Sequence, residues 1–345
     1  MSEFVLARAD VKVLLWHMTA YGLSAILEDA GLCGVSLAWG GAPAQPVPIL
    51  SADGLSADAV DDAVRTHATR YVTEPSWVLA DVELRGSARG LMSPRLTPFD
   101  TPKIWRDVQD ARHGQLDRLT ETRSWLDLRM LAALGEPSYW SRSRQDVALQ
   151  DDGASRLEMQ PRNQGSELVG SRLRKLAHVL AARTTGTIAT GLAGSTCVDE
   201  IGGGKPDSRT PTGLASPGPT DNAVAWCALW GISQFPLAQQ SRGTARTTGH
   251  IGRSRSEWFY VPVWHGSWRP ARLRSVLVSR QLGDAAKAGF SGRWAADETA
   301  LSKAQAWLQA RGVEGVVRFP IERFGSDSAP ERRAMLGQPV RLGMS

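Results

Sequence analysis

The chain has 345 residues, of which 42% are hydrophobic and 22% are charged, an ordinary composition for a globular protein with one large core or two smaller ones. It contains no apolar run of the roughly 20 residues needed to span a bilayer, and no signal-peptide pattern, so we exclude a membrane protein and expect a cytoplasmic one. Its 3 cysteines are odd in number and widely spaced, which predicts reduced thiols instead of a disulfide framework or a zinc site.

Residues 1–140 show the patterns of strands and helices in succession. The helix expected over 19–30 has Thr19 as its cap and Gly31 as its stop signal. The segment 56–71 is amphipathic, with acidic residues early and basic residues late, as the helix dipole favours. A Pro/Gly-rich loop is expected at 87–102. Strands are expected at 11–16, 35–39, 47–50 and 77–84, and two more helices at 102–119 and 123–134.

A polar, loop-rich region at 141–220 precedes a second region of helices and strands at 221–345. The nearly all-apolar helix 223–230, capped by Asp221 or Thr220, is expected to be buried. Segment 240–256 has no hydrophobic periodicity, which predicts an exposed loop. Helices are also expected at 171–183 and 299–311, a hairpin at 257–263 and 273–278 with its turn near Gly266, and a last strand at 316–321. Together these patterns predict an α+β fold with a mixed or antiparallel sheet, packed helices and irregular basic loops.

The positive charge of the chain is concentrated in one segment. Residues 242–280 carry eight arginines and one acidic residue, Glu257, a net charge of +7, whereas the rest of the chain sums to −2. A confined basic stretch is typical of a protein that replaces the counterions of nucleic-acid phosphates. A GC-rich genome also favours arginine over lysine, but it does not explain why acidic residues are scarce in this segment.

Segment 242–280 also interleaves its arginines with aromatic residues. Arginine makes planar, bidentate contacts with phosphate, and aromatic rings offer stacking surfaces to unpaired bases. The alternative is a solvated arginine-rich loop beside a hairpin whose aromatic residues belong to the core. The residues of this segment that we predict to contact nucleic acid are Arg242, Arg246, His250, Arg253, Arg255, Arg269, Arg272 and Arg274.

The helix expected at 171–183 has a basic face outside its apolar stripe. Arg172 and Lys175 are the residues of this face that we predict to lie along a nucleic-acid backbone. The alternative is an ordinary solvated helix surface, which is what a run of charges on a helix usually forms.

The glycine-rich loop 199–209 offers Lys205 and Arg209 to nucleic acid. It is not a phosphate-binding P-loop, because Lys205 is followed by proline, the first glycine is missing and no helix follows. A metal-dependent nuclease needs carboxylates on rigid elements, whereas Asp199 and Glu200 sit among glycines. We therefore favour a flexible loop that becomes ordered on nucleic acid.

Catalytic motifs are not visible in the sequence. The 6 histidines are scattered, and there is no G-x-S-x-G, no H-E-x-x-H and no His/Cys pair at metal-ligand spacing. We therefore expect no enzymatic activity, no cofactor and no metal. His250, inside the basic segment, is the histidine that we retain as a phosphate contact or general base.

Three short segments carry patterns of small and apolar residues. The first is AYGLSAILEDAG at 20–31, and the second is DNAVAWCALWGISQF at 221–235, followed by the aromatic strand 259–264. The third, within 317–342, has R-F-x-I-x-R-x-G before L-G-x-x-V-R. Together they resemble the large subunits of CRISPR Cascade-type effector complexes, in particular those of the type I-G (formerly I-U) group.

The resemblance covers less than a third of the chain, and it implies a non-catalytic subunit of an RNA-guided DNA-targeting complex. Its implied partners are guide RNA, target DNA, the backbone and guide-end-binding subunits of Cascade, and a recruited helicase-nuclease. Such a subunit helps to recognise the motif adjacent to the target, while pairing with the guide supplies sequence identity. The chain is shorter than most such large subunits, so a separate small subunit would supply their C-terminal helical bundle.

Two alternatives stay open at the level of sequence. One is an endoribonuclease that processes guide RNA, with His250 or His17 as general base and nearby arginines stabilising the transition state. The other is a scaffold that touches only proteins and pairs its arginines with acidic partners.

Overall fold

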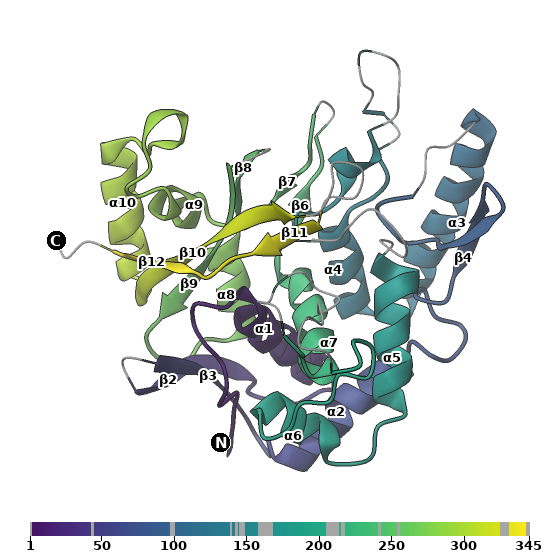
Figure 1. The fold of residues 1–345 in the computed structure, drawn as a ribbon, viewed down its shortest axis with the longest axis horizontal. Helices are drawn as coiled ribbons and strands as arrows, with labels where there is room; N and C mark the ends of the chain where they lie inside the picture. Colours follow the sequence, from purple (N-terminus) through teal and green to yellow (C-terminus); the bar gives the residue numbers. More distant parts are fainter. Residues whose placement is uncertain are drawn as a thin grey trace.

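Helices and antiparallel sheets surround one continuous hydrophobic core in the computed structural model (Figure 1), which confirms the predicted α+β class. The structure describes residues 2–42, 45–96, 101–138, 140–141, 144, 149–157, 168–204, 214, 218–240, 243–253, 256–324 and 331–342, with the backbone alone at 150, 151, 253, 293 and 331. None of the described helices is both long enough and apolar enough to cross a bilayer.

The helices follow the apolar periodicity of the sequence, and several begin at side-chain caps. Ser56, Thr101, Asp221, Ser279 and Asp297 each accept a hydrogen bond from a backbone N–H of the first turn that follows. The α-helices are α1 (Leu14–Asp29), α2 (Ala57–Thr69), α3 (Pro102–Glu121), α4 (Trp125–Leu134), α5 (Arg174–Ala181), α6 (Thr187–Ala193), α7 (Asn222–Trp230), α8 (Pro270–Leu277), α9 (Arg280–Ala286) and α10 (Glu298–Gln309).

The strands form one large sheet and three small ones, and every pairing among them is antiparallel. The small sheets are β1–β3–β2, β4–β5 and β6–β7. The strands are β1 (Ser2–Val5), β2 (Ser36–Ala42), β3 (Gln45–Ala52), β4 (Asp81–Leu84), β5 (Ser87–Gly90), β6 (Leu237–Ala238), β7 (Arg246–Thr247), β8 (His250–Arg253), β9 (Ser256–Trp264), β10 (Val313–Phe324), β11 (Glu331–Ala334) and β12 (Gln338–Arg341).

Strand β10 is the centre of the large sheet. On one edge, β10 pairs with β9, which pairs in turn with β8. On its other edge, the first half of β10 pairs with β12 and the second half pairs with β11. The aromatic pair Phe259 and Phe319 points towards α1, where His17 lies 5.6 Å from the Phe319 ring. On the opposite face, Arg318 donates to two carbonyl oxygens at the end of α9. The sheet is therefore covered by α1 on one face and by α9 on the other.

Helices α1 and α7 cross at the centre of the molecule (Figure 1), and glycine permits their close approach. A methyl group at Gly22 of α1 would lie 1.8 Å from the carbonyl oxygen of Cys227. At Gly231, just after α7, it would lie 2.3 Å from the carbonyl oxygen of Met18. These contacts are shorter than any van der Waals separation, so both positions require glycine. The all-apolar helix predicted at 223–230 is indeed buried on every side.

A polar network is enclosed in the same core. The Nδ1 atom of His67 accepts a hydrogen bond from the Trp226 indole at 3.2 Å, and its Nε2 atom lies 3.3 Å from the Tyr71 hydroxyl. Tyr71 donates to Asp127 at 2.7 Å, and the Trp77 indole donates to the same carboxylate oxygen at 2.7 Å. The network joins α2, α4 and α7, and it satisfies groups that would be costly to bury alone.

The structure corrects several expectations about local structure. Thr19 lies inside α1 and does not cap it, and the loop expected at 87–102 begins with strand β5. Residues 11–16 are not a strand, because α1 begins at Leu14 and buries this apolar run in its first turn. Segment 273–278 is the helix α8, which starts with Pro270 in its first turn, so β9 pairs with β8 and β10 and the predicted hairpin is wrong. Segment 240–256 is not a plain exposed loop, since it contains β7 and β8.

Candidate nucleic-acid interface

The eight arginines of segment 242–280 occupy different environments. Arg242 and Arg255 lie outside the described residues, and only the backbone of Arg253 is described, in β8. Arg274 lies 3.5 Å from a glutamate of α1, and Arg280 lies 3.2 Å from an aspartate of its own helix. These two side chains are therefore engaged within the fold. The exposed members without such an ion pair are Arg246, Arg269 and Arg272.

Two guanidinium groups near the start of α8 lie on tryptophan rings. The Arg272 guanidinium carbon is 4.7 Å from the ring centre of Trp268, and that of Arg311 is 3.5 Å from the ring centre of Trp307. Arg272 also donates from Nη2 to the backbone carbonyl oxygen of Arg311 at 2.6 Å, and Arg269 is the exposed N-cap residue of α8. We call Arg269, Arg272 and Arg311, with their two tryptophans, the Arg272 surface.

The geometry of the Arg272 surface suits phosphate. A guanidinium that stacks on a ring has its N–H groups in the plane of the stack, where they point past the ring towards solvent. Within the described part of the chain, none of its three arginines forms an ion pair with a carboxylate. The surface therefore holds three positive charges that form no ion pair with a described carboxylate, and two of them are positioned on tryptophan rings.

The aromatic residues of the segment belong mostly to the core. Phe259, Tyr260, Trp264 and Trp268 are buried, and the rings of Trp264 and Trp268 stack with a centroid distance of 4.5 Å. Trp258 of β9 is partly buried and packs against Phe290, which follows α9, at 4.7 Å between ring centroids. The expectation that these rings stack on bases therefore gives way to the core alternative, and among them Trp268 supports an arginine, Arg272.

His250 lies in β8 beside a carboxylate. Its Nε2 atom is 3.4 Å from Glu257, and its ring packs against Phe259 at 5.3 Å between centroids. Burial lowers the pKa of His250 below its ordinary value, although the Glu257 carboxylate opposes that shift. His17, the other candidate base, is fully buried in α1, where burial lowers its pKa to about 4. Neither imidazole is presented at the surface as a general base would be.

The basic face predicted on helix 171–183 is partly consumed by ion pairs. Residues 169–173 form a π-helical turn that leads into α5, with Arg172 half-buried and Lys175 exposed. Arg174 forms a bidentate pair with Asp81, at 2.7 and 3.1 Å. Lys175 is thus the residue of this face that stays available to a ligand, and its role remains a prediction.

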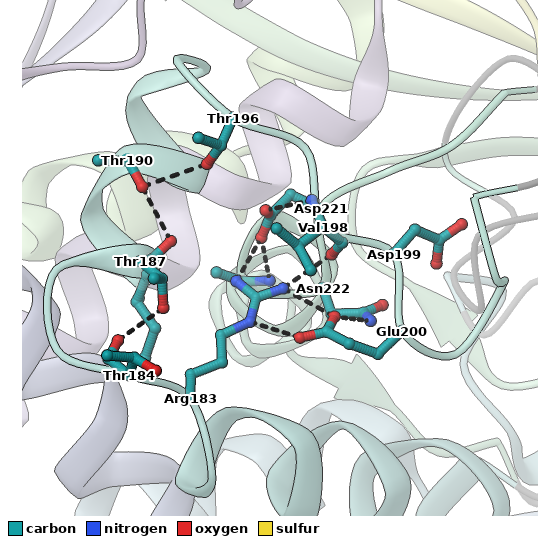
Figure 2. Close-up of polar contacts among 12 residues, drawn as sticks. Arg183, Thr184, Thr187, Thr190, Thr196, Val198, Asp199, Glu200, Asp221 and Asn222 are labelled. Carbon is teal, nitrogen blue, oxygen red and sulfur yellow. Dashed lines mark hydrogen bonds and ion pairs between the residues drawn. The ribbon is translucent and has the colours of Figure 1, made fainter.

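Arg183, just beyond α5, is the centre of a polar cluster (Figure 2). Its guanidinium donates to Asp221 at 2.7 Å, to both carboxylate oxygens of Glu200 at 2.8 and 2.9 Å, and to the backbone carbonyl oxygen of Val198 at 2.8 Å. Asn222, the residue after the Asp221 cap, donates from its side-chain amide to Glu200 at 2.5 Å. Arg183 and Asp221 are 5% and 3% exposed, so the cluster is a buried clamp between α5, α7 and the loop after α6.

This clamp settles part of the interpretation of loop 199–209. Glu200 is held by Arg183, which lowers the pKa of that carboxyl, and Asp199 accepts a hydrogen bond from the backbone N–H of Gly202 at 2.8 Å. Both acids are thus occupied within the protein, and no cluster of potential metal ligands occurs among the described residues. Lys205 and Arg209 lie outside those residues.

Arg311 and Trp307 of the Arg272 surface were not among the predicted site residues. They lie beyond segment 242–280, four residues apart at the end of α10, where side chains on a helix meet. The W-x-x-x-R spacing inside a predicted helix was the signal for this pair. Only tertiary structure brings the pair next to Arg272.

Comparison with known proteins adds no relative. No protein-family model, no curated protein and no solved structure matches this chain. Gly22 and Gly231, which stand in two of the segments that carry the Cascade resemblance, are the packing glycines of the α1–α7 crossing. Those patterns therefore have a structural explanation of their own.

Proposed function

We propose that this protein is a non-catalytic subunit that binds the phosphate backbone of nucleic acid through the Arg272 surface. The observation that carries the proposal is a contrast between arginines. Arg174, Arg183 and Arg280 are paired with carboxylates, whereas Arg269, Arg272 and Arg311 are grouped and form no ion pair with a described carboxylate. Grouped cations that are not held in ion pairs favour a polyanionic ligand.

The stacking on tryptophan strengthens this interpretation. A free arginine side chain loses rotamer entropy when it binds, and here part of that loss has already occurred on folding. Trp268 is 1% exposed, so the ring beneath Arg272 cannot move away when a ligand approaches. The surface is therefore preorganised for phosphate, as binding sites with fixed donors usually are.

We further propose that the complex in which this subunit works is an RNA-guided, Cascade-type complex that targets DNA. The support is the resemblance of three sequence segments together with a basic surface on a chain without a visible catalytic motif. In such a complex the Arg272 surface would hold target DNA near the adjacent motif, and the guide RNA would supply sequence recognition.

The binding proposal is tested with purified protein and a labelled DNA duplex. We expect the triple variant Arg269→Gln, Arg272→Gln, Arg311→Gln to bind about tenfold or more weakly than the wild type at low salt. Arg280→Gln is the matched control, because Arg280 is exposed but pairs with Asp284. Equal affinity of the triple variant and the control would contradict the proposal.

The assembly proposal needs a separate experiment. The tagged chain, expressed in its own host, is purified at low salt and the RNA that accompanies it is sequenced. We expect repeat-derived guide RNA and additional protein subunits. Recovery of the chain alone, with no enrichment of such RNA, would contradict membership of a guide-RNA complex and leave the DNA-binding proposal to its own test.

A further inference from the structure

A second group of positive charges lies at the far end of β9 from the Arg272 surface. Glu257 of β9 is paired with Ile321 of β10, and Arg323, two residues further along β10, points to the same face of the sheet. Arg332 of β11 is the direct partner of Arg323 in the register. Two arginines thus stand side by side across neighbouring strands, and like charges so placed repel each other.

Two loops bring further arginines to this end of the sheet. Arg156 is placed by its backbone N–H, which donates to the Thr247 hydroxyl of β7 at 2.9 Å. Arg95 donates to the carbonyl oxygen of Ser155 at 3.4 Å, so the two loops are joined. Both arginines have further contacts of their own, and both contribute positive potential at Arg332. We call Arg95, Arg156, Arg323 and Arg332, with Glu257 and His250, the Arg332 cluster.

The two strand arginines of the Arg332 cluster are not neutralised by ion pairs. In the described part of the chain, neither Arg323 nor Arg332 pairs with a carboxylate, and the Glu257 carboxylate, which attracts Arg332, also contacts His250. Burial, assisted by the neighbouring arginines, lowers the pKa of Arg332 to about 10. The buried Nε atom of Arg332 has no hydrogen-bond partner in the described part of the chain. A partly buried cation with a vacant donor and like-charged neighbours destabilises a fold unless an anion is present.

We propose that the Arg332 cluster is a binding site for a phosphate group, with Arg332 and Arg323 as its principal donors and Arg156 and Arg95 as the cations around it. The strand register places the Arg323 and Arg332 side chains on one face of the sheet, and the loops that carry Arg156 and Arg95 lie at the same end of the sheet. Glu257 is shared between His250 and Arg332, so the charges of the two strand arginines remain for a ligand. That the phosphate belongs to a nucleic acid rests on the proposed function, whereas the phosphate site itself does not.

The test measures thermal unfolding and inorganic phosphate binding at constant ionic strength, with chloride as the reference anion. We expect phosphate to stabilise the wild type more than chloride does. We expect Arg332→Gln to be at least as stable as the wild type without phosphate and to bind phosphate roughly tenfold or more weakly, since a charge-assisted hydrogen bond is lost. Arg272→Gln, outside the cluster, is expected to keep the phosphate effect.

Three results would overturn the inference. One is the absence of any phosphate effect on the wild type, and another is an unchanged effect in Arg332→Gln. The third is a clear loss of stability of Arg332→Gln in phosphate-free buffer, which would mean that Arg332 pairs with an anion of the chain itself. If that variant does not fold, Arg323→Gln, at an exposed position, replaces it and should weaken phosphate binding.

Oligonucleotides identify the source of the phosphate and separate this inference from the proposed function. Preference for a 5′-phosphorylated strand over a hydroxyl-ended one, lost in Arg332→Gln, indicates a terminal phosphate. Equal binding of both strands, weakened in Arg332→Gln, indicates an internal one. If the wild type binds inorganic phosphate but no oligonucleotide, the nucleic-acid function fails while the phosphate site stands. If oligonucleotides bind and phosphate has no effect, the reverse holds.

Discussion

The guanidinium of Arg272 lies on the ring of Trp268, 4.7 Å from its centre, and this contact connects the surface of the protein to its core. Trp268 is buried, stacks on Trp264, and exchanges backbone hydrogen bonds with Leu37 of β2 at 2.8 Å. The position of Arg272 is thus fixed by the packing of strands distant in sequence. An exposed arginine on an unsupported loop would lack such a constraint.

Replacement of Arg272 by lysine separates charge from planarity. Arg272→Lys keeps the charge but loses the flat group on Trp268 and the fixed fork of donors. We expect DNA affinity to fall by roughly threefold to tenfold with the salt dependence unchanged, whereas Arg272→Gln should also reduce the slope of log Kd against log salt by about 1. Fluorescence anisotropy over a salt series measures both quantities. Identical behaviour of Arg272→Lys and wild type would show that the stacked geometry is irrelevant.

The crossing of α1 and α7 gives a prediction about stability. A methyl group at Gly22 would collide with the backbone of Cys227, so we expect Gly22→Ala to lower the free energy of unfolding by about 2 kcal/mol or more. Gly114→Ala is the matched control. Gly114 lies in α3, where a methyl group meets nothing, so the same substitution should raise stability by up to about 1 kcal/mol. Urea unfolding compares the two, and effects of the same sign would contradict the packing argument.

Loss of Arg183 should be costly because its partners are buried. Arg183→Met leaves the carboxylate of Asp221, which is 3% exposed, without its cation, and we expect a destabilisation of about 3–5 kcal/mol. Lys103→Met removes one partner of an exposed pair with Asp107 and should cost less than about 0.5 kcal/mol. Chemical denaturation provides the comparison. A small effect of Arg183→Met would show that the cluster in Figure 2 does not clamp the loop.

The buried histidines predict loss of stability at low pH. Burial lowers the pKa of His17 from 6.5 to about 4. Below about pH 6.5, His17 is therefore protonated in the unfolded chain, whereas in the folded protein it stays neutral until the pH approaches 4. The contribution of His17 to the free energy of unfolding is fully present above about pH 6.5 and decreases as the pH falls below it. Between pH 7.5 and pH 5 the loss should be about 2 kcal/mol.

The variant His17→Gln isolates this contribution. Glutamine can still donate to the Val11 carbonyl oxygen, which the His17 Nε2 atom contacts at 2.8 Å, but it cannot be protonated. We expect its stability to fall by about 2 kcal/mol less than that of the wild type over the same pH interval. The exposed variant His113→Gln should follow the wild-type curve. Parallel curves for His17→Gln and wild type would refute the assignment.

Local signals predicted much of the fold. Asp221 caps α7 as expected, and the apolar periodicity located α2, α4, α7 and α10. The errors arose where tertiary packing decides between structures. The run 11–16 is apolar in either a strand or a buried helix turn, and its pattern alone cannot distinguish them. For α8, Pro270 in the first turn favoured a helix, but the apolar alternation of 273–278 favoured a strand and led to the wrong prediction.

The site was predictable only in part. The excess of arginine in 242–280 located Arg269 and Arg272, but charge counting cannot tell an arginine that is paired, such as Arg274 beside Glu28, from one that is not. Arg311 was not predicted as a site residue, because the end of α10 meets α8 only in the folded chain. The Arg332 cluster was not predicted for the same reason, since its arginines come from four separate segments of the chain.

The measurement that tests the central claim most directly is the salt dependence of DNA binding by the wild type and by the triple variant of the Arg272 surface. If Arg269, Arg272 and Arg311 contact phosphates, log Kd of the wild type rises steeply with log salt, and the triple variant has a slope smaller by about 2 to 3. A wild-type Kd that stays constant between low and moderate salt, or the same slope in both proteins, would contradict the account.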